Sequence, residues 1–369
     1  MLFDAYVPTR THDSLEVRVR SSSSDPVALQ LGDTRRVVEV PLVSHRGTHF
    51  FRHTFTELPS GTSWPLELRQ GTDRASLEGS TLPRAPGPEK MRIGLLADLH
   101  LSTQQSSIDA YGTSTRRLYG LACELTARYV RRLEALGVDA IVLLGDVVDP
   151  CSDETLGLLR QTIDSIQVPV YAVIGNHEAW CPGGEVRFYC AFDLPAGGYY
   201  SVHRDGVRLV MLSTPEPDAL DPSSPQRRWL EDELRAASPD EDILLFSHFS
   251  LLLHPCVQGA KNDGYQLLRG HRELLQLLHG FPRVRAFVAG HKNVPSLVVS
   301  SGVAHTLSPQ LIQAPCGYDV LRLYEGGMAR TTYEIDEQHY CEVARTAYGA
   351  QFPERYGTED GRNFLHLYG

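Results

Sequence analysis

The chain has 369 residues, more than a single hydrophobic core usually accommodates, so two domains are expected. Apolar residues make up 42% and charged residues 22% of the chain, a composition typical of globular proteins without long disordered regions. The formal net charge of −10 argues against a protein that binds long nucleic acids, because such proteins normally carry a basic surface. A phosphorylated small molecule is still compatible with this charge, since bound metal ions can invert the local charge of an acidic pocket.

Cysteine usage and the start of the chain bear on location. The seven cysteines are odd in number and fit no zinc-site spacing, so we expect core thiols in a reducing compartment. The first residues lack a basic segment followed by an apolar one, and no run of about 18 apolar residues occurs. We therefore expect a cytoplasmic protein without a membrane partner. Homo-oligomer formation stays open.

Residues 1–85 are expected to form a small all-β sandwich domain. Short alternating or β-branched runs are separated by turn signals such as S-S-S-S-D-P and P-S-G-T, and no helical period is visible. The expected strands are 15–20, 27–31, 35–43, 49–55 and 64–70. The Pro-rich stretch ending in residues 86–90 is expected to be a linker, because it has neither a strand pattern nor a packed face.

From residue 91 the pattern changes to alternating strands and helices. Apolar runs such as I-G-L-L-A and A-I-V-L-L-G indicate buried strands, whereas 115–136, 153–166 and 266–281 have helical spacing. This β-α-β alternation predicts an α/β domain over residues 91–337 with helices on the faces of its sheet. The tail 338–369 is rich in Tyr and Phe, and we expect it to pack on that domain.

Polar side chains of metal-ligand type follow five of the expected strands. In open α/β sheets, ligands bind at the carboxyl ends of the strands, so these side chains should meet at one edge. Carboxylate oxygens and imidazole nitrogens without thiolates suit Mn²⁺, Fe²⁺, Zn²⁺ or mixed pairs. The residues concerned are Asp98, His100, Asp146, Asp149, Asn176, His177, Glu178, His248, His291 and Asn293.

Five short motifs occur in a fixed order along this region. They are D-x-H at 98–100, G-D-x-x-D at 145–149, G-N-H-E at 175–178, a lone His at 248 and G-H-x-N at 290–293. Each motif alone recurs by chance, but the ordered set, each member after a strand, resembles the calcineurin-like metallophosphoesterases over about residues 91–330.

This resemblance implies a fold and a metal centre. The fold is an α/β four-layer sandwich (αββα) over the catalytic domain 91–337, preceded by the small all-β sandwich. The centre holds two divalent ions, Mn, Fe or Zn, with Mn favoured. The family pattern assigns Asp98, His100 and Asp146 to the first metal. It assigns Asn176, His248 and His291 to the second, with Asp146 bridging both.

The resemblance also implies a mechanism. A metal-activated hydroxide attacks phosphorus, and His177 acts as the general acid that protonates the leaving oxygen. Glu178 is expected to orient His177, and Asp149 is expected to orient a ligand. Asp149 also stands where purple acid phosphatases carry Tyr, which argues against an iron centre with a tyrosinate ligand.

Asn293 departs from the family pattern, in which the last motif usually ends in a second His on the first metal. An amide oxygen ligates hard cations but is a poorer donor than imidazole for Fe²⁺ or Zn²⁺. Three interpretations follow. Asn293 contacts the metal and favours Mn²⁺, His254 or His305 substitutes for it, or the first site is weak.

Further candidates surround this constellation. Lysine occurs only at three positions, so a phosphate-binding cation is expected to be Arg. His254 is a candidate substrate or metal contact. The polar loop after His100 supplies further candidate substrate contacts at Tyr111, Arg116 and Arg117. Trp180, just after the G-N-H-E motif, either lines the pocket or is a packed aromatic residue, and we expect the second.

The sequence therefore predicts a hydrolase for a phosphomonoester or phosphodiester. The expected substrate is a small soluble molecule such as a nucleotide, a cyclic nucleotide or a sugar phosphate. Two alternatives stay open. One is a protein that binds metal or a phosphorylated ligand but has lost catalysis through Asn293. The other is a metal-dependent enzyme of different chemistry on the same scaffold.

Overall fold

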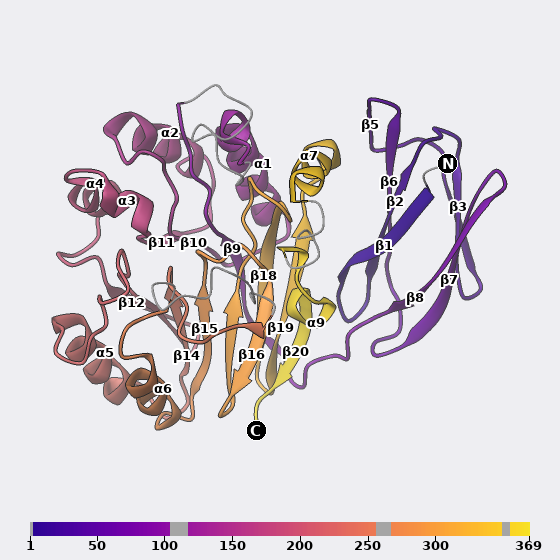
Figure 1. The fold of residues 1–369 in the computed structure, drawn as a ribbon. Helices are drawn as coiled ribbons and strands as arrows, with labels where there is room; N and C mark the ends of the chain where they lie inside the picture. The colour runs from indigo at the N-terminus through magenta and orange to yellow at the C-terminus, as the bar shows by residue number, and fades with distance from the viewer. Residues whose placement is uncertain (1–2, 104–116, 256–266, 349–354) are drawn as a thin grey trace.

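The N-terminal region forms two antiparallel sheets that face each other (Figure 1). The computed structural model of the chain describes residues 3–103, 117–255, 267–348 and 355–369. One sheet has the order β1-β2-β6-β5 and the other β4-β3-β7-β8, and apolar side chains from both fill the space between them. This is the expected all-β sandwich. Its strands are β1 Phe3–Arg10, β2 Leu15–Ser21, β3 Val27–Leu31, β4 Thr34–Val38, β5 Val43–His45, β6 Thr48–Phe55, β7 Ser63–Gln70 and β8 Asp73–Ser80.

Two six-stranded sheets form the centre of the second region. The first has the order β11-β10-β9-β18-β19-β20, in which β9, β10 and β11 run parallel. Its strands are β9 Glu89–Leu96, β10 Ala140–Leu144, β11 Val170–Val173, β18 Gly317–Tyr324, β19 Gly327–Glu334 and β20 Asn363–Leu367.

The second sheet has the order β12-β13-β14-β15-β17-β16, with β13, β14, β15 and β17 parallel. Its edge strands β12 and β16 run antiparallel to their neighbours. The strands are β12 Tyr200–Arg204, β13 Val207–Met211, β14 Asp242–Ser247, β15 Val284–Ala289, β16 Ser296–Ser300 and β17 Val303–Leu307.

Helices cover the outer face of each sheet, which gives the αββα layers. The first sheet is covered by α1 Ala122–Ala135, α2 Asp153–Ile163 and α4 Gly184–Ala191. The second is covered by α5 Pro225–Ala236 and α6 His271–His279. The remaining helices are the short η1 Tyr119–Leu121, α3 Asn176–Trp180, α7 Gln338–Tyr348 and α9 Glu359–Arg362.

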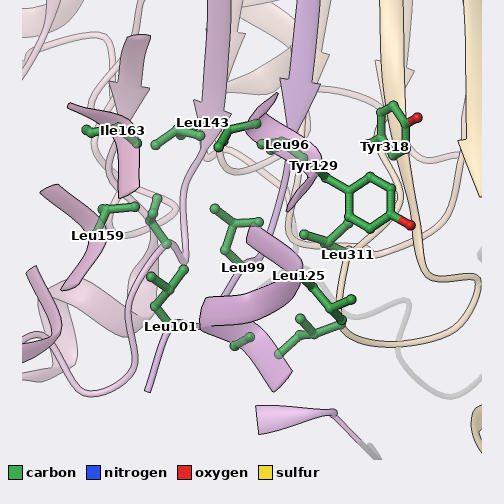
Figure 2. Packing of buried hydrophobic residues seen from close by; sticks show 14 of the residues in the cluster. Leu96, Leu99, Leu101, Leu125, Tyr129, Leu143, Leu159, Ile163, Leu311 and Tyr318 are labelled. Atoms are coloured by element: carbon green, nitrogen blue, oxygen red, sulfur yellow. The ribbon is translucent and has the colours of Figure 1, made fainter. Parts of the chain in front are cut away.

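Strand β10 is apolar throughout because both of its faces are buried. Ile141 and Leu143 point to the helix-covered face, part of which Figure 2 shows. Val142 and Leu144 point into the core between the two sheets. Because side chains alternate across a strand and both faces are buried, every position must be apolar. The polar residues follow directly after these buried strands, at the edge of the sheet.

The segments that flank the αββα layers differ in detail from the expectations. Strand β9 begins at Glu89, inside the expected linker 86–90. The tail 338–369 does more than pack on the second region, because β20 pairs with β19 and completes the first sheet. We propose residues 1–85 and 91–337 as the two domains, with the tail joined to the second.

A buried arginine of the sandwich contacts the second region. Arg18 on β2 donates to the backbone carbonyls of Glu334 and Ile335 and pairs with Glu16. Burial would lower the pKa of Arg18, but the charges of Glu16 and Glu334 raise it. These contacts connect β2 of the sandwich with the end of β19. None of the helices in the described ranges is long and apolar enough to cross a membrane.

Candidate metal centre

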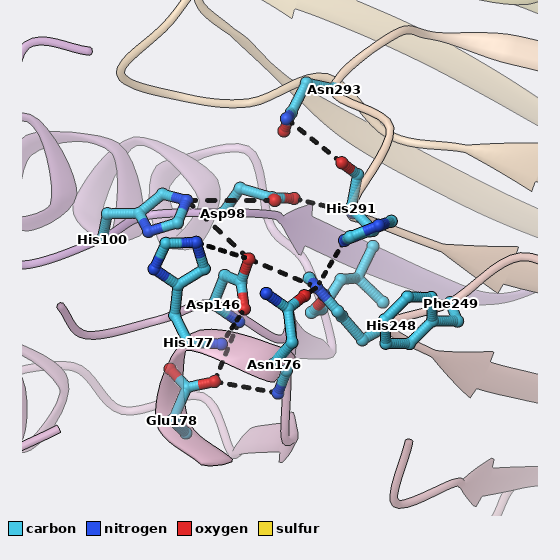
Figure 3. A network of polar contacts seen from close by, with 12 residues as sticks. Asp98, His100, Asp146, Asn176, His177, Glu178, His248, Phe249, His291 and Asn293 are labelled. Atoms are coloured by element: carbon cyan, nitrogen blue, oxygen red, sulfur yellow. Dashed lines mark hydrogen bonds and ion pairs between the residues drawn. The ribbon is translucent and has the colours of Figure 1, made fainter. Parts of the chain in front are cut away.

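The polar side chains that follow the strands meet at one edge of the two sheets (Figure 3). Those after β9, β10 and β11 come from the first sheet, and those after β14 and β15 come from the second. Both sheets contribute their parallel strands, whose carboxyl ends share a direction. The centre therefore lies across the boundary between the sheets, as expected for strand-end ligands.

Several of these residues have a left-handed backbone. Five have φ values between 43° and 63°, a range that non-glycine residues rarely adopt and that clusters at functional sites. They are Asp98, His100, Asp146, His291 and Asn293. Two glycines allow the close approach of these loops. A Cβ on Gly145 would lie 2.5 Å from the His248 ring, and one on Gly175 would lie 2.3 Å from Oδ1 of Asp146.

Ligand-type atoms form two groups that share Asp146. In each group the atoms lie within 4.8 Å of one another. In one, Oδ2 of Asp146 lies 3.9 Å from Nε2 of both His100 and His177. In the other, the same oxygen lies 3.3 Å from Nε2 of His248, which is 3.2 Å from Nδ1 of His291. One carboxylate thus faces two candidate metal positions.

Buried polar atoms without a hydrogen-bond partner indicate whether these residues could bind a cation. Within the described ranges, Oδ1 of Asp98, Nε2 of His100 and Oδ1 of Asn293 are buried without a hydrogen-bond partner. A buried polar atom without a partner costs free energy, and all three are atoms that donate lone pairs to metals. Oxygen and imidazole atoms of this kind, left without other partners, are suited to binding divalent metal ions.

His248 has the tautomer that metal binding requires. Its Nδ1 donates to the carbonyl oxygen of Leu144 at 2.8 Å, which leaves Nε2 directed at Asp146 and at Oδ1 of Asn176, 3.0 Å away. Burial would lower the pKa of His248, but the charges of Asp146 and Asp98 raise it to about 9.

His177 is held by a chain of polar contacts. Its Nδ1 lies 2.9 Å from Oδ2 of Asp149, which also accepts from the hydroxyl of Tyr119 at 3.0 Å and lies 3.4 Å from Nδ1 of His100. Burial would lower the pKa of His177, but Asp146 and Asp149 raise it. Asp149 thus orients two rings at once. The sequence analysis missed Tyr119, because no local pattern pairs it with a residue 30 positions away.

Glu178 does not have the position that we expected. Its carboxylate accepts backbone N–H groups of Asp146 at 3.1 Å, Val147 at 2.6 Å, Val148 at 3.0 Å and Gly175 at 2.8 Å. The side chain therefore fixes the loop after β10, and the residue that orients His177 is Asp149. The prediction was wrong because the G-N-H-E spacing gives adjacency along the chain, whereas the fold turns Glu178 beneath the loop.

The structure gives the contacts of Asn293 and of the two histidines that were considered as its substitutes. Its Nδ2 donates to the carbonyl of His291 at 3.2 Å, so Oδ1 is the free ligand atom. His254 instead bonds through Nδ1 to Ser296 Oγ at 2.9 Å. His305 lies on β17, and neither it nor His254 belongs to the two ligand groups found in the described ranges.

Of the expected substrate contacts, Arg117 lies beside the centre. Burial would lower the pKa of Arg117, but Tyr119 and then the charges of Asp146 and Asp98 raise it. It also donates to the Tyr119 hydroxyl at 3.1 Å. Tyr111 and Arg116 lie outside the described residues.

Two ring contacts complete the surroundings. Phe249, which the sequence analysis did not single out, packs on the His291 ring with centroids 4.3 Å apart. Trp180 is not the packed aromatic residue that we expected, because 57% of it is exposed. It nevertheless lies against His177, with ring centroids 4.7 Å apart.

Comparison with known families identifies this arrangement. The model of the family described as calcineurin-like phosphoesterase matches residues 91–295, more than half of the chain. The chain belongs to the calcineurin-like phosphoesterase family. The matched residues run from β9 to the turn that carries Asn293, and so include all five motifs.

Two curated relatives are named as phosphodiesterases. A probable glycerophosphodiester phosphodiesterase GpdQ from Arcobacter nitrofigilis is 29% identical over 158 residues, which are 42% of this chain and 56% of the relative. The chain therefore matches little more than half the length of that relative. A 3',5'-cyclic-nucleotide phosphodiesterase from Nostoc is 23% identical over 217 residues, 55% of this chain and 72% of the relative.

Solved structures support the fold. A dimetal phosphatase from Danio rerio superposes with a TM-score of 0.57 at 19% identity, covering 76% of this chain and all of the other. A purple acid phosphatase from yellow lupin gives 0.52 at 14% identity, covering 98% of this chain and 74% of the other. With the family match, these structures show that the chain has the αββα fold of this family.

We predict that Glu178→Gln lowers the free energy of unfolding of the metal-free protein by about 2–4 kcal/mol, because an amide cannot accept all the N–H groups that the carboxylate accepts. Burial and then Asp146 raise the pKa of Glu178 to about 7. Urea unfolding is therefore measured at a pH of about 8.5, where this carboxylate is ionised. The control is Glu154→Gln, an exposed position in the first turn of α2. Equal stability of the two variants would contradict the assigned role.

Proposed function

We propose that this family member hydrolyses phosphodiesters of small soluble molecules at a centre of two divalent metal ions, with manganese favoured. The sharing of Asp146 by two groups of ligand-type atoms carries the proposal. A carboxylate that faces two cation positions is the arrangement used by two-metal hydrolases.

The ligands of the two ions are proposed from the atoms that converge. Oxygens of Asp98, Asp146 and Asn293 with the His100 imidazole would hold one ion. The other would be held by Asp146 together with Asn176, His248 and His291. Bound divalent ions supply charge neutralisation at the phosphate and lower the pKa of the attacking water. An oxygen-rich first set, completed by an amide, suits Mn²⁺ better than Zn²⁺.

His177 is proposed as the general acid rather than as a ligand. Although its Nε2 lies 3.9 Å from Asp146, its side chain is 11% exposed, whereas those of His100 and His248 are fully buried. The raised pKa favours the protonated ring, and Asp149 fixes Nδ1 so that Nε2 can donate. In the reaction the water oxygen bonds to phosphorus and the ester bond to the leaving oxygen breaks. That oxygen takes the Nε2 proton, and the proton released by the water restores the imidazolium.

Arg117 is proposed as the residue that binds a non-bridging phosphate oxygen. The charges of Asp146 and Asp98 act on its guanidinium, and Nη1 donates to the Tyr119 hydroxyl at 3.1 Å. A planar guanidinium can bind phosphate through two parallel hydrogen bonds. Diester rather than monoester hydrolysis is supported by the names of both curated relatives, which are phosphodiesterases.

We predict that protein stripped of metal is inactive and that Mn²⁺ restores hydrolysis of bis(nitrophenyl) phosphate. The rate on this diester should exceed the rate on nitrophenyl phosphate by about tenfold or more, a difference of roughly 1.4 kcal/mol in barrier. Release of nitrophenol is followed by absorbance, with metal content measured on the same samples. Faster hydrolysis of the monoester would overturn the diesterase proposal, and no turnover of either ester by metal-loaded protein would overturn the hydrolytic one.

We predict that His177→Ala lowers kcat for glyceryl methyl phosphate by about 10²–10⁴, the usual contribution of a general acid, because an alkoxide leaves only with a proton. Nitrophenolate leaves without one, so kcat for bis(nitrophenyl) phosphate should fall far less. Metal content should stay at the wild-type level, as in the control His203→Ala at an exposed position on β12. If His177→Ala instead loses bound metal and both rates fall alike, His177 is a ligand.

A further inference from the structure

Trp180 is the most exposed aromatic side chain in the described ranges. It is 57% exposed, although Trp is usually well buried because of its large apolar surface. An exposed aromatic residue beside polar groups is a common feature of binding sites, where a ligand covers the ring. The exposed indole of Trp180 is therefore a surface that a bound ligand would cover.

Helix α3 places Trp180 beside the proposed general acid. Residues three positions apart lie on the same side of a helix, and the rings of Trp180 and His177 have centroids 4.7 Å apart with 41° between their planes. The short helix ends at Trp180. The chain then turns away at Cys181, whose backbone is extended. The indole is therefore in contact with the His177 ring and is much more exposed than that side chain, which is 11% exposed.

From this position we infer that Trp180 is a specificity-determining residue, a stacking surface for a planar aromatic leaving group such as the nucleoside of a nucleotide diester. The inference rests on the proposed function, because it places the leaving oxygen at Nε2 of His177. On this placement, the group attached to that oxygen lies close to the indole that packs against the His177 ring. A nucleobase can stack on the indole, whereas glycerol offers no ring.

The chemistry is the diester hydrolysis described above. The bond between phosphorus and the nucleoside oxygen breaks, a bond between phosphorus and the water oxygen forms, and His177 protonates the departing nucleoside. Trp180 gives and takes no proton or electron. Trp180 contributes binding energy by contacting the leaving group. Its effect is therefore a preference for one leaving group over another.

The test compares two diesters whose leaving groups are both primary alcohols, so that both need the same proton from His177. One is the methyl ester of adenosine monophosphate, assayed by release of adenosine. The other is glyceryl methyl phosphate, assayed by release of glycerol. In Mn²⁺-loaded protein, Trp180→Ala should lower the ratio of the two kcat/KM values by about 5- to 100-fold, mainly through a higher KM for the adenosyl ester. Trp180→Phe should restore most of the ratio.

Equal losses on both substrates would overturn the inference, because they would show that Trp180 acts only by positioning His177. An unchanged ratio would overturn it as well. Turnover of glyceryl methyl phosphate by the wild type tests the proposed diesterase activity independently of Trp180, so the two failures can be told apart.

A binding measurement decides the case even without turnover. Adenosine monophosphate should quench the tryptophan fluorescence of the Mn²⁺-loaded protein to saturation, and glycerol phosphate should not. The quench should disappear in Trp180→Phe and persist in Trp64→Phe, a matched change on β7 of the sandwich. Quenching without turnover would support the stacking role of Trp180 and contradict the proposed hydrolysis. No saturable quench would overturn the stacking surface itself.

Discussion

The placement of one buried carboxylate, that of Asp146, is the constraint on which the centre depends. Its oxygens face ligand atoms from both sheets, and it accepts the backbone N–H of His177 at 2.9 Å. Burial would raise the pKa of Asp146, but the neighbouring His248 and His177 hold it well below its usual range. The loop that carries it is fixed from beneath by Glu178. A concentrated buried charge is stable only with compensating cations, so the fold prepares a metal site before any metal binds.

Much of the fold could be predicted because the buried strands are short, apolar and followed by glycine or polar residues. The sandwich was predicted without β1 and β8, and with one strand over 35–43 where the structure has β4 and β5. Strand β1 contains Pro8, and its register with β2 shifts there, as is common in an edge strand. Strand β8 is also an edge strand, and its polar, half-exposed pattern carries little hydrophobic signal. Strand β20 lies near the chain end, and only its pairing with β19 makes it part of the sheet.

At the site, the residue types and their order on the chain predicted which side chains converge, because strand ends share an edge. They did not predict which residue contacts which. The roles of Glu178 and Asp149 depend on how two loops fold over each other, and the Tyr119 contact joins segments far apart in sequence. The exposure of Trp180 depends on where a five-residue helix ends. A local sequence pattern predicts neither these long-range contacts nor the exposure of Trp180.

The most direct test of the shared carboxylate is the number of metal ions bound per chain. Metal-stripped protein is dialysed to equilibrium against Mn²⁺, and bound metal is measured by elemental analysis for the wild type and for Asp146→Asn. We expect two ions per chain in the wild type and the loss of both in the variant, because each position loses the same ligand. A wild type with one ion, or a variant that keeps one at full occupancy, would contradict a centre organised around Asp146.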